Sequence, residues 1–116
     1  MATIDQFGLL GAEANEIVPY KRPLSSMTPT IVMKDNELFF TTGSPGGARI
    51  ISAVLQSILN IIDFEMSLEE ATKARRVHHQ WQPDVLEIEY YIDDKANKEL
   101  LDMGYSVKIR RPLTCI

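Results

Sequence analysis

The sequence predicts an α+β fold with a mostly antiparallel sheet. Two segments rich in β-branched and aromatic residues, 30–34 and 37–42, are separated by two residues, as in an antiparallel hairpin. Residues 48–63 repeat apolar side chains with helical spacing. Further patterns follow, in the overall order strand, strand, helix, helix, strand, helix, strand. An opening hairpin combined with packed helices is typical of the α+β class.

Residues 1–29 are predicted to be irregular, and residues 30–116 to form a sheet-and-helix core. Neither strand nor helix periodicity persists in the first segment. Prolines and glycines interrupt it, namely Pro19, Pro23, Pro29, Gly8 and Gly11. A loop this long is uncommon in a compact domain unless it is functional or packs against another segment. We therefore interpret residues 1–116 as a single partial domain.

The predicted hairpin turns at Asp35 and Asn36, two residue types that tolerate a positive φ. The glycine-rich segment 43–47 then breaks the second strand and leads into the helix of residues 48–63. Its apolar face contains Ile50, Ile51, Val54, Leu55, Ile58, Ile61 and Ile62, widened by Ala53 and Leu59. A helix apolar around so much of its circumference is expected to be buried on more than one side.

Capping signals define the later helices. Ser67 and Glu70 form a capping box that starts a short helix ending near Ala74. Gly104 is placed as the C-terminal cap of an amphipathic helix. The remaining predicted elements are a strand at 85–89, that helix at 93–103 and a strand at 105–110.

Composition argues against several classes of protein. The 116 residues carry a net charge of −4 without a basic block, which argues against a nucleic-acid partner. The N-terminus does not resemble a signal peptide, and the longest apolar stretch, 50–62, is too short and too polar to span a bilayer. The single cysteine, Cys115, has no activating pattern around it and is interpreted as a buried inert thiol.

The segment from Gly43 to Arg49 is the most informative for chemistry. A strand that ends in glycines and opens a helix presents several backbone N–H groups, which suit an anion or a developing oxyanion. The segment is neither a Walker loop nor a dinucleotide-binding pattern. The alternative is a plain strand-to-helix turn in which glycine relieves steric strain. On the residues alone both interpretations stay open.

Ser25 and Ser26 lie between prolines and beside Lys21 and Arg22, an arrangement that would suit a carboxylate-binding corner. The alternative is a polar loop. A role as catalytic nucleophile is disfavoured, because no G-x-S-x-G elbow surrounds the serines and no base can be assigned.

His78 and His79 raise the hypothesis of a metal site. Adjacent residues point to opposite faces of a strand, however, and no cysteine accompanies them. We therefore predict no metal site, a structural, hydrogen-bonded role for both imidazoles, and a packed Trp81.

Four blocks of sequence together resemble bacterial γ-glutamyltranspeptidase, both in their residues and in their order along the chain. They are Lys21-Arg22-Pro23-Leu24-Ser25-Ser26-Met27 followed by Pro29-Thr30-Ile31-Val32, then Thr42-Gly43-Ser44-Pro45-Gly46-Gly47, then His78-His79-Gln80-Trp81, and Pro83-Asp84. The likeness runs from about Phe7 to Arg110, which is most of the chain.

The resemblance implies an N-terminal nucleophile hydrolase with a four-layer αββα sandwich, of which this chain would be a part. In that family a precursor cuts itself into a large and a small subunit. The threonine freed at the new N-terminus attacks the γ-glutamyl amide of glutathione and its conjugates, with its own α-amino group as base. The acyl-enzyme then passes the γ-glutamyl group to water or to an acceptor amino acid or peptide. No cofactor is implied.

The same resemblance implies roles for individual residues. Gly46 and Gly47 correspond to the glycines whose backbone N–H groups form the oxyanion hole. Ser25 and Ser26 correspond to the pair that holds the α-carboxylate of the γ-glutamyl group.

The sequence also departs from the family pattern. Nothing in it corresponds to the nucleophilic threonine or to the residues that bind the substrate α-amino group, and Thr3 does not lie in a matching processing site. The family's final glycine-rich segment and closing strands have no counterpart either. Arg75 stands where the bacterial pattern usually has proline, Val77 where it has phenylalanine and Ala48 where it often has serine.

We therefore expect part of a small subunit that is inactive alone. Its expected partners are the N-terminal part of the small subunit, the large subunit and γ-glutamyl small molecules. The preferred γ-glutamyl compound stays open, since some relatives act on cephalosporin side chains or poly-γ-glutamate. Full-length relatives are usually periplasmic, secreted or membrane-anchored. The competing hypothesis is a stand-alone non-catalytic module, such as a homodimer that buries an exposed sheet face.

Overall fold

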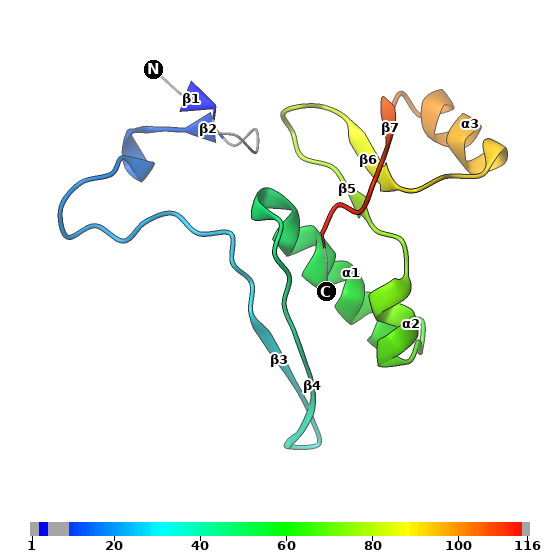
Figure 1. Ribbon diagram of the computed structural model, residues 1–116, viewed down its shortest axis with the longest axis horizontal. Helices are drawn as coiled ribbons and strands as arrows, with labels where there is room; N and C mark the ends of the chain where they lie inside the picture. Colours follow the sequence, from blue (N-terminus) through cyan, green and yellow to red (C-terminus); the bar gives the residue numbers. More distant parts are fainter. Residues whose placement is uncertain (1–2, 5–9, 115–116) are drawn as a thin grey trace.

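The computed structural model describes residues 3–4 and 10–114 (Figure 1). It has mixed helices and sheets, which confirms the predicted α+β class. The chain measures 45 × 44 × 21 Å, with a radius of gyration of 16.7 Å. A compact domain of this length would have a radius of gyration of about 13 Å. The chain is therefore flat and open, with its central hairpin extending away from the rest (Figure 1).

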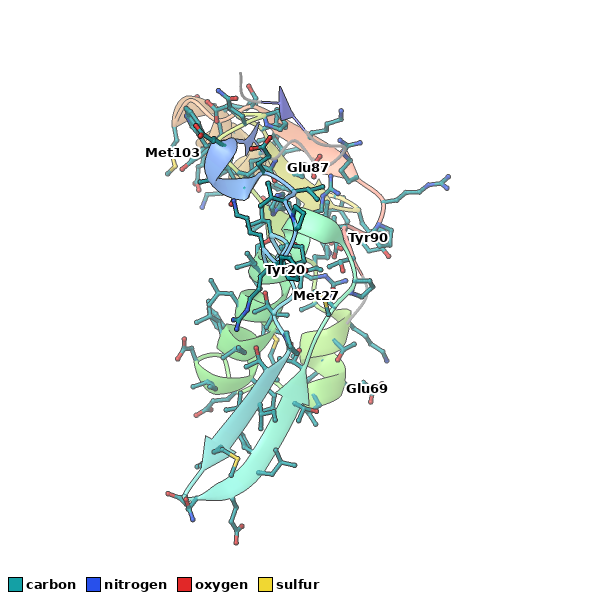
Figure 2. The ribbon with its side chains drawn as sticks, turned by 90° about the vertical axis from the view of Figure 1, so that its left-hand side faces the viewer. Tyr20, Met27, Glu69, Glu87, Tyr90 and Met103 are labelled. Carbon is teal, nitrogen blue, oxygen red and sulfur yellow. The ribbon has the colours of Figure 1, made fainter. Side chains whose placement is uncertain are left out.

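That hairpin consists of β3 (Thr30–Lys34) and β4 (Glu37–Thr42), which pair antiparallel. Asp35 and Asn36 have φ angles of 51° and 65°, so the predicted two-residue turn is confirmed. In the two strands only Phe40 is buried. Figure 2 shows the other side chains projecting from both faces of the hairpin.

The long apolar helix begins after one 3-10 turn, η2 (Gly47–Arg49), and forms α1 (Ile50–Ile62), as predicted. Its buried residues are Ile50, Ala53, Val54 and Ser57, whereas Ile51, Leu55, Leu59 and Ile62 are exposed. The expectation of burial on more than one side is wrong for the described chain. Apart from η2, the elements that contact α1 most are α2 (Leu68–Lys73) and β5 (Val77–His78), which leave its other side uncovered.

The two later helices follow their predicted capping signals. Ser67 N donates to Glu70 Oε2 at 2.9 Å, and Glu70 N donates to Ser67 Oγ at 3.3 Å, which is the capping box of α2. The helix α3 (Asp94–Asp102) begins with a side-chain cap from Asp93 and is followed by Gly104 at a φ of 93°.

The second sheet has the order β5, β6 (Leu86–Glu89), β7 (Val107–Arg110). The strand β6 pairs antiparallel with β5 and parallel with β7, to which α3 connects it. The strands predicted at 85–89 and 105–110 are confirmed. The strand β5 was not predicted, because a two-residue strand shows no alternation in sequence. The parallel pairing of β6 with β7 was not predicted either, because it joins strands that α3 separates in the sequence.

The described part of the first segment is mostly irregular. It contains a short antiparallel pair, β1 (Thr3–Ile4) with β2 (Leu10–Gly11), and a 3-10 turn, η1 (Glu13–Asn15). Cys115 lies outside the described residues, so its burial stays a prediction. Within residues 3–4 and 10–114, no helix combines the length and apolar character needed to cross a bilayer.

Candidate functional site

The loop between β4 and α1 contains two consecutive glycines with positive φ. Gly46 has a φ of 140° and Gly47 a φ of 59°, values that side-chain-bearing residues rarely adopt. Within the described part of the chain, no group accepts a hydrogen bond from the backbone N–H of either glycine. Because η2 and α1 follow directly, these donors lie at a helix N-terminus, where the helix dipole favours negative charge.

The serine pair lies against this loop, although 21 residues separate the two segments in sequence. Ser26 Oγ donates to the carbonyl oxygen of Gly47 at 2.8 Å. Ser25 Oγ accepts from Met27 N at 3.2 Å, so this bond does not use the Ser25 hydroxyl hydrogen. The structure therefore brings together the two pairs of residues that the sequence singled out.

Ser25, Ser26 and Gly47 border a cleft of about 680 Å³, whose lining does not include Gly46. The cleft is lined by Leu24, Ser25, Ser26, Gly47, Ala48, Ile51, Ser52, Leu55, His78, His79 and Gln80. The apolar part of this lining includes Ile51 and Leu55 of α1. A mostly apolar cleft with a few convergent polar groups is the usual form of a small-molecule site.

The two histidines form separate hydrogen bonds. His78 is buried, and its Nδ1 and Nε2 lie 2.8 Å from Ser52 Oγ and 2.8 Å from Gln80 Oε1. His79 Nε2 lies 2.8 Å from Asp84 Oδ1. The prediction of hydrogen-bonded imidazoles is confirmed. Within the residues that the structure describes, no group of three His, Cys, Asp or Glu could hold a metal ion.

The prediction of a packed Trp81 is wrong. Its side chain is 75% exposed, in the turn that follows β5. Among the described residues, no element covers this turn. The preceding sequence His78-His79-Gln80 does not indicate whether Trp81 is covered.

Thr114, at the end of the described residues, contacts the loop between β4 and α1. No sequence pattern indicated this contact or the buried residue Glu89, which helps to hold it. Thr114 is buried, and its hydroxyl donates to the carbonyl oxygen of Pro45. Glu89, which is 0% exposed, accepts from Leu113 N at 2.6 Å and from Arg76 N at 3.0 Å. These contacts join positions up to 69 residues apart, so no local pattern could have identified them.

A second buried carboxylate, Glu87, lies on the same strand, β6 (Figure 2). Glu87 Oε2 accepts from Arg49 Nε at 2.9 Å, and Oε1 accepts from Arg110 Nε at 2.8 Å. Burial is the largest single influence and raises the pKa of Glu87. The hydrogen bonds and charges of Arg49 and Arg110 together outweigh burial, so the pKa lies below the usual 4.5. This pair of contacts ties the turn after Gly47 to β6 and β7.

Because the folded-state pKa of Glu87 is lowered, its contribution to stability is present above pH 4.5 and is lost as the pH falls through the folded-state value. We expect Glu87→Gln to lower the free energy of unfolding at pH 7 by about 1.5–3 kcal/mol, the usual contribution of hydrogen bonds to a charged group. The difference from the parent chain should shrink below pH 4.5. Urea unfolding at pH 7 and pH 3 measures this, with exposed Glu99→Gln as control. An equal difference at both pH values would contradict the assignment.

Nearly the whole chain is similar to proteins of one family. The family model described as Gamma-glutamyltranspeptidase matches residues 1–114. The glutathione hydrolase proenzyme of Escherichia coli (strain K12) is 48% identical over 107 residues, which are 92% of this chain and 18% of that protein. The chain thus spans less than a fifth of the length of this relative.

Solved structures show the same relationship. A mutant of Helicobacter pylori gamma-glutamyltranspeptidase superposes with a TM-score of 0.93 and 46% identity, over 97% of this chain and 61% of that chain. Gamma-glutamyltranspeptidase from Pseudomonas nitroreducens gives a TM-score of 0.88 and 39% identity, over 97% and 60%. Sequence and structure agree over nearly the whole chain, and the chain belongs to the γ-glutamyltranspeptidase family.

Proposed function

We propose that this chain supplies the oxyanion-stabilising and carboxylate-binding residues of an enzyme that transfers γ-glutamyl groups. The donor would be glutathione or another γ-glutamyl amide, and the acceptor water, an amino acid or a peptide. The observation that carries the proposal is the contact of the serine pair with the glycine pair, where Ser26 Oγ donates to Gly47 O at 2.8 Å. A short carbon chain separates the α-carboxylate of a glutamyl group from its γ-carbonyl, so one substrate could reach both pairs.

The acyl-transfer step would use the backbone N–H groups of the two glycines, which have no acceptor among the described residues. A threonine hydroxyl from a partner segment attacks the γ-carbonyl carbon, and the carbonyl π electrons move onto oxygen. The N–H groups of Gly46 and Gly47 donate to this oxyanion, which stabilises the transition state more than the ground state. When the intermediate collapses, the C–N bond breaks and the amine leaves with the proton that the threonine gave up. Water or an acceptor amine then attacks the ester in the same way and frees the threonine.

The serine pair would hold the α-carboxylate. Ser25 Oγ accepts from Met27 N, which leaves its hydroxyl hydrogen for a carboxylate oxygen. Ser26 now donates to Gly47 O, so a bound carboxylate would compete with that carbonyl for the Ser26 hydrogen. We infer that Ser26 rotates its hydroxyl on substrate binding, while Ser25 donates from its present position.

The proposal gives the chain two macromolecular partners, the rest of a small subunit and a large subunit. The short span relative to the Escherichia coli protein, 18% of its length, supports this. So does the exposed apolar surface on the hairpin and α1, which includes Ile31, Leu38, Ile51 and Leu55. Extended exposed apolar surface usually marks an interface.

Two activity measurements test the proposed function. We expect no turnover of a γ-glutamyl anilide by the 116-residue chain alone, with or without glycylglycine as acceptor. We expect turnover by a chimeric enzyme in which this chain, through Thr114, replaces the matching segment of the Escherichia coli proenzyme. In the chimeric enzyme, combined Ser25→Ala and Ser26→Ala should raise KM for the donor by about tenfold or more, because each lost hydrogen bond goes to a charged group. Ser106→Ala, at an exposed position just before β7, is the control.

Each outcome decides between hypotheses. A chimeric enzyme that is folded and cleaved into subunits but inactive would contradict the proposed function. Turnover by the chain alone that survives repurification would contradict the placement of the nucleophile in a partner. A fluorophosphonate adduct on Ser25 or Ser26 would indicate a serine hydrolase instead. A homodimer of the chain, together with an inactive chimeric enzyme, would favour the stand-alone module, in which the exposed apolar surface pairs with a second copy.

A further inference from the structure

Residues 113 and 114 lie directly against the glycine loop. A Cβ atom placed on Gly46 would lie 2.9 Å from Thr114 Oγ1 and 3.0 Å from Thr114 Cβ. Thr114 is 6% exposed, and its hydroxyl contacts both Ser44 Oγ and the carbonyl oxygen of Pro45. Thr114 therefore contacts the loop at Pro45, the residue before Gly46, which is the first proposed oxyanion donor.

The position of Thr114 is set by a buried ion pair. Arg76 Nη2 lies 3.3 Å from Glu89 Oε2 and donates to the carbonyl oxygen of Thr114 at 3.1 Å. Glu89 Oε1 accepts from the preceding N–H, that of Leu113, at 2.6 Å. The side chains of the pair are 9% and 1% exposed. The N–H of Leu113 is thus held by Glu89 of β6, and the carbonyl of Thr114 by Arg76, which precedes β5.

Peptide geometry connects Thr114 to the proposed oxyanion site. The carbonyl of Pro45 and the N–H of Gly46 belong to one planar trans peptide unit, in which they point in opposite directions. A hydrogen bond that holds the Pro45 carbonyl oxygen therefore also fixes the direction of the Gly46 N–H. The next unit is held in the same way, because the Gly46 carbonyl accepts from Arg49 N at 3.2 Å.

We propose that Thr114 is a positioning residue for the proposed oxyanion hole, held in place by the Arg76–Glu89 pair. Its hydroxyl fixes the Pro45–Gly46 peptide so that the Gly46 N–H points at the developing charge, while the turn η2 fixes the Gly47 N–H. Ser44 Oγ, which contacts Thr114 Oγ1, donates to the same Pro45 carbonyl oxygen at 2.8 Å, so Thr114 acts together with Ser44. Gly46, on the other side of this peptide, adds little restraint, since glycine adopts many conformations. The inference rests on the proposed function of the glycine pair, and it assigns no contact between Thr114 and substrate.

Thr114→Val and Thr114→Ser in the chimeric enzyme test this role. Valine keeps the shape of threonine and removes the hydroxyl, whereas serine keeps the hydroxyl. We expect Thr114→Val to lower kcat on the order of 100-fold, as small misplacements of catalytic groups do, with KM for the donor little changed. Affinity for a γ-boronate analogue of glutamate, whose tetrahedral adduct carries the negative charge, should fall in parallel, and affinity for glutamate should not. Thr114→Ser should retain most of the activity.

A second measurement uses the 116-residue chain and does not depend on activity. The amide NMR signal of Gly46 should shift in Thr114→Val but stay near its parent position in Thr114→Ser, with the Gly43 amide as internal control. If Thr114→Val does not fold, Thr114→Ala removes the same hydroxyl without adding an atom. Parent-like kcat and boronate affinity in Thr114→Val, equal losses in the Val and Ser variants, or an unmoved Gly46 amide would each overturn the inference. An inactive parent chimeric enzyme would count against the proposed function, and the amide shift would still decide the role of Thr114.

Discussion

Replacing Gly46 with alanine is expected to lower kcat of the chimeric enzyme by roughly 100-fold or more, the usual cost of losing one oxyanion donor. Alanine at a φ of 140° is strained, at about 1–3 kcal/mol for such a conformation. Its Cβ would also lie 2.9 Å from Thr114 Oγ1, closer than such atoms approach in proteins. Both effects rotate the peptide away from its present orientation, so the N–H no longer points at the oxyanion. Steady-state kinetics with a γ-glutamyl anilide measures the loss.

Gly43→Ala is the matched control for this change. Gly43 lies in the same loop and has no positive φ, and a Cβ added to its backbone would meet no atom within 4 Å. The same chemical substitution there should leave kcat within about twofold, since surface changes usually have little effect on the folded state. Equal losses of kcat in the two variants would show that alanine anywhere in this loop impairs the enzyme. The loss in Gly46→Ala would then no longer support Gly46 as a specific oxyanion donor.

Local chemistry explains why much of the fold could be predicted from sequence. Asp35 and Asn36 accept the positive φ that a two-residue turn needs, and the hairpin forms around them. Ser67 and Glu70 satisfy each other's backbone N–H groups within a single turn of helix. Each of these signals involves residues less than five positions apart, so a linear sequence displays them in full.

The glycine and serine pairs could be selected as candidates, but their contact could not be predicted from local patterns. The strand-to-helix turn at Gly46 and Gly47 has a recognisable chemistry, and the serines have a recognisable setting between prolines. What the sequence does not display is the bond between Ser26 and Gly47, which depends on how the irregular segment before β3 passes the loop. The structure adds this contact, and with it the argument for a shared site.

Long-range contacts account for what sequence reasoning missed. The parallel pairing of β6 with β7 depends on the crossover through α3, and the role of Thr114 depends on a carboxylate 25 positions earlier, Glu89. In sequence, a buried glutamate in a strand looks like an ordinary polar residue of an alternating pattern. Its burial becomes evident only when Arg76, Leu113 and Thr114 are found around it.

Glu89→Gln is expected to lower the free energy of unfolding by about 3–5 kcal/mol, the usual cost of breaking a buried ion pair by removing one partner. Glu89 is 0% exposed, and its two oxygens accept from Arg76 N, Arg76 Nε and Leu113 N. Glutamine presents one acceptor and one donor group. Whichever way its amide is turned, an NH2 group faces an N–H donor, and the Arg76 guanidinium stays buried without a countercharge.

Glu69→Gln is the matched control, because Glu69 also pairs with a cation but on the exposed surface of α2. The side chains of Glu69 and Lys73 are 75% and 73% exposed, and such helix pairs contribute only about 0.3–0.5 kcal/mol. Urea unfolding of the two variants, followed by circular dichroism, should therefore separate them by several-fold in lost stability. Similar losses in both variants would mean that Glu89 contributes no more than a surface charge. In that case the ion pair could not be what holds Leu113 and Thr114 against the glycine loop, and the position of the Gly46 peptide would need another source.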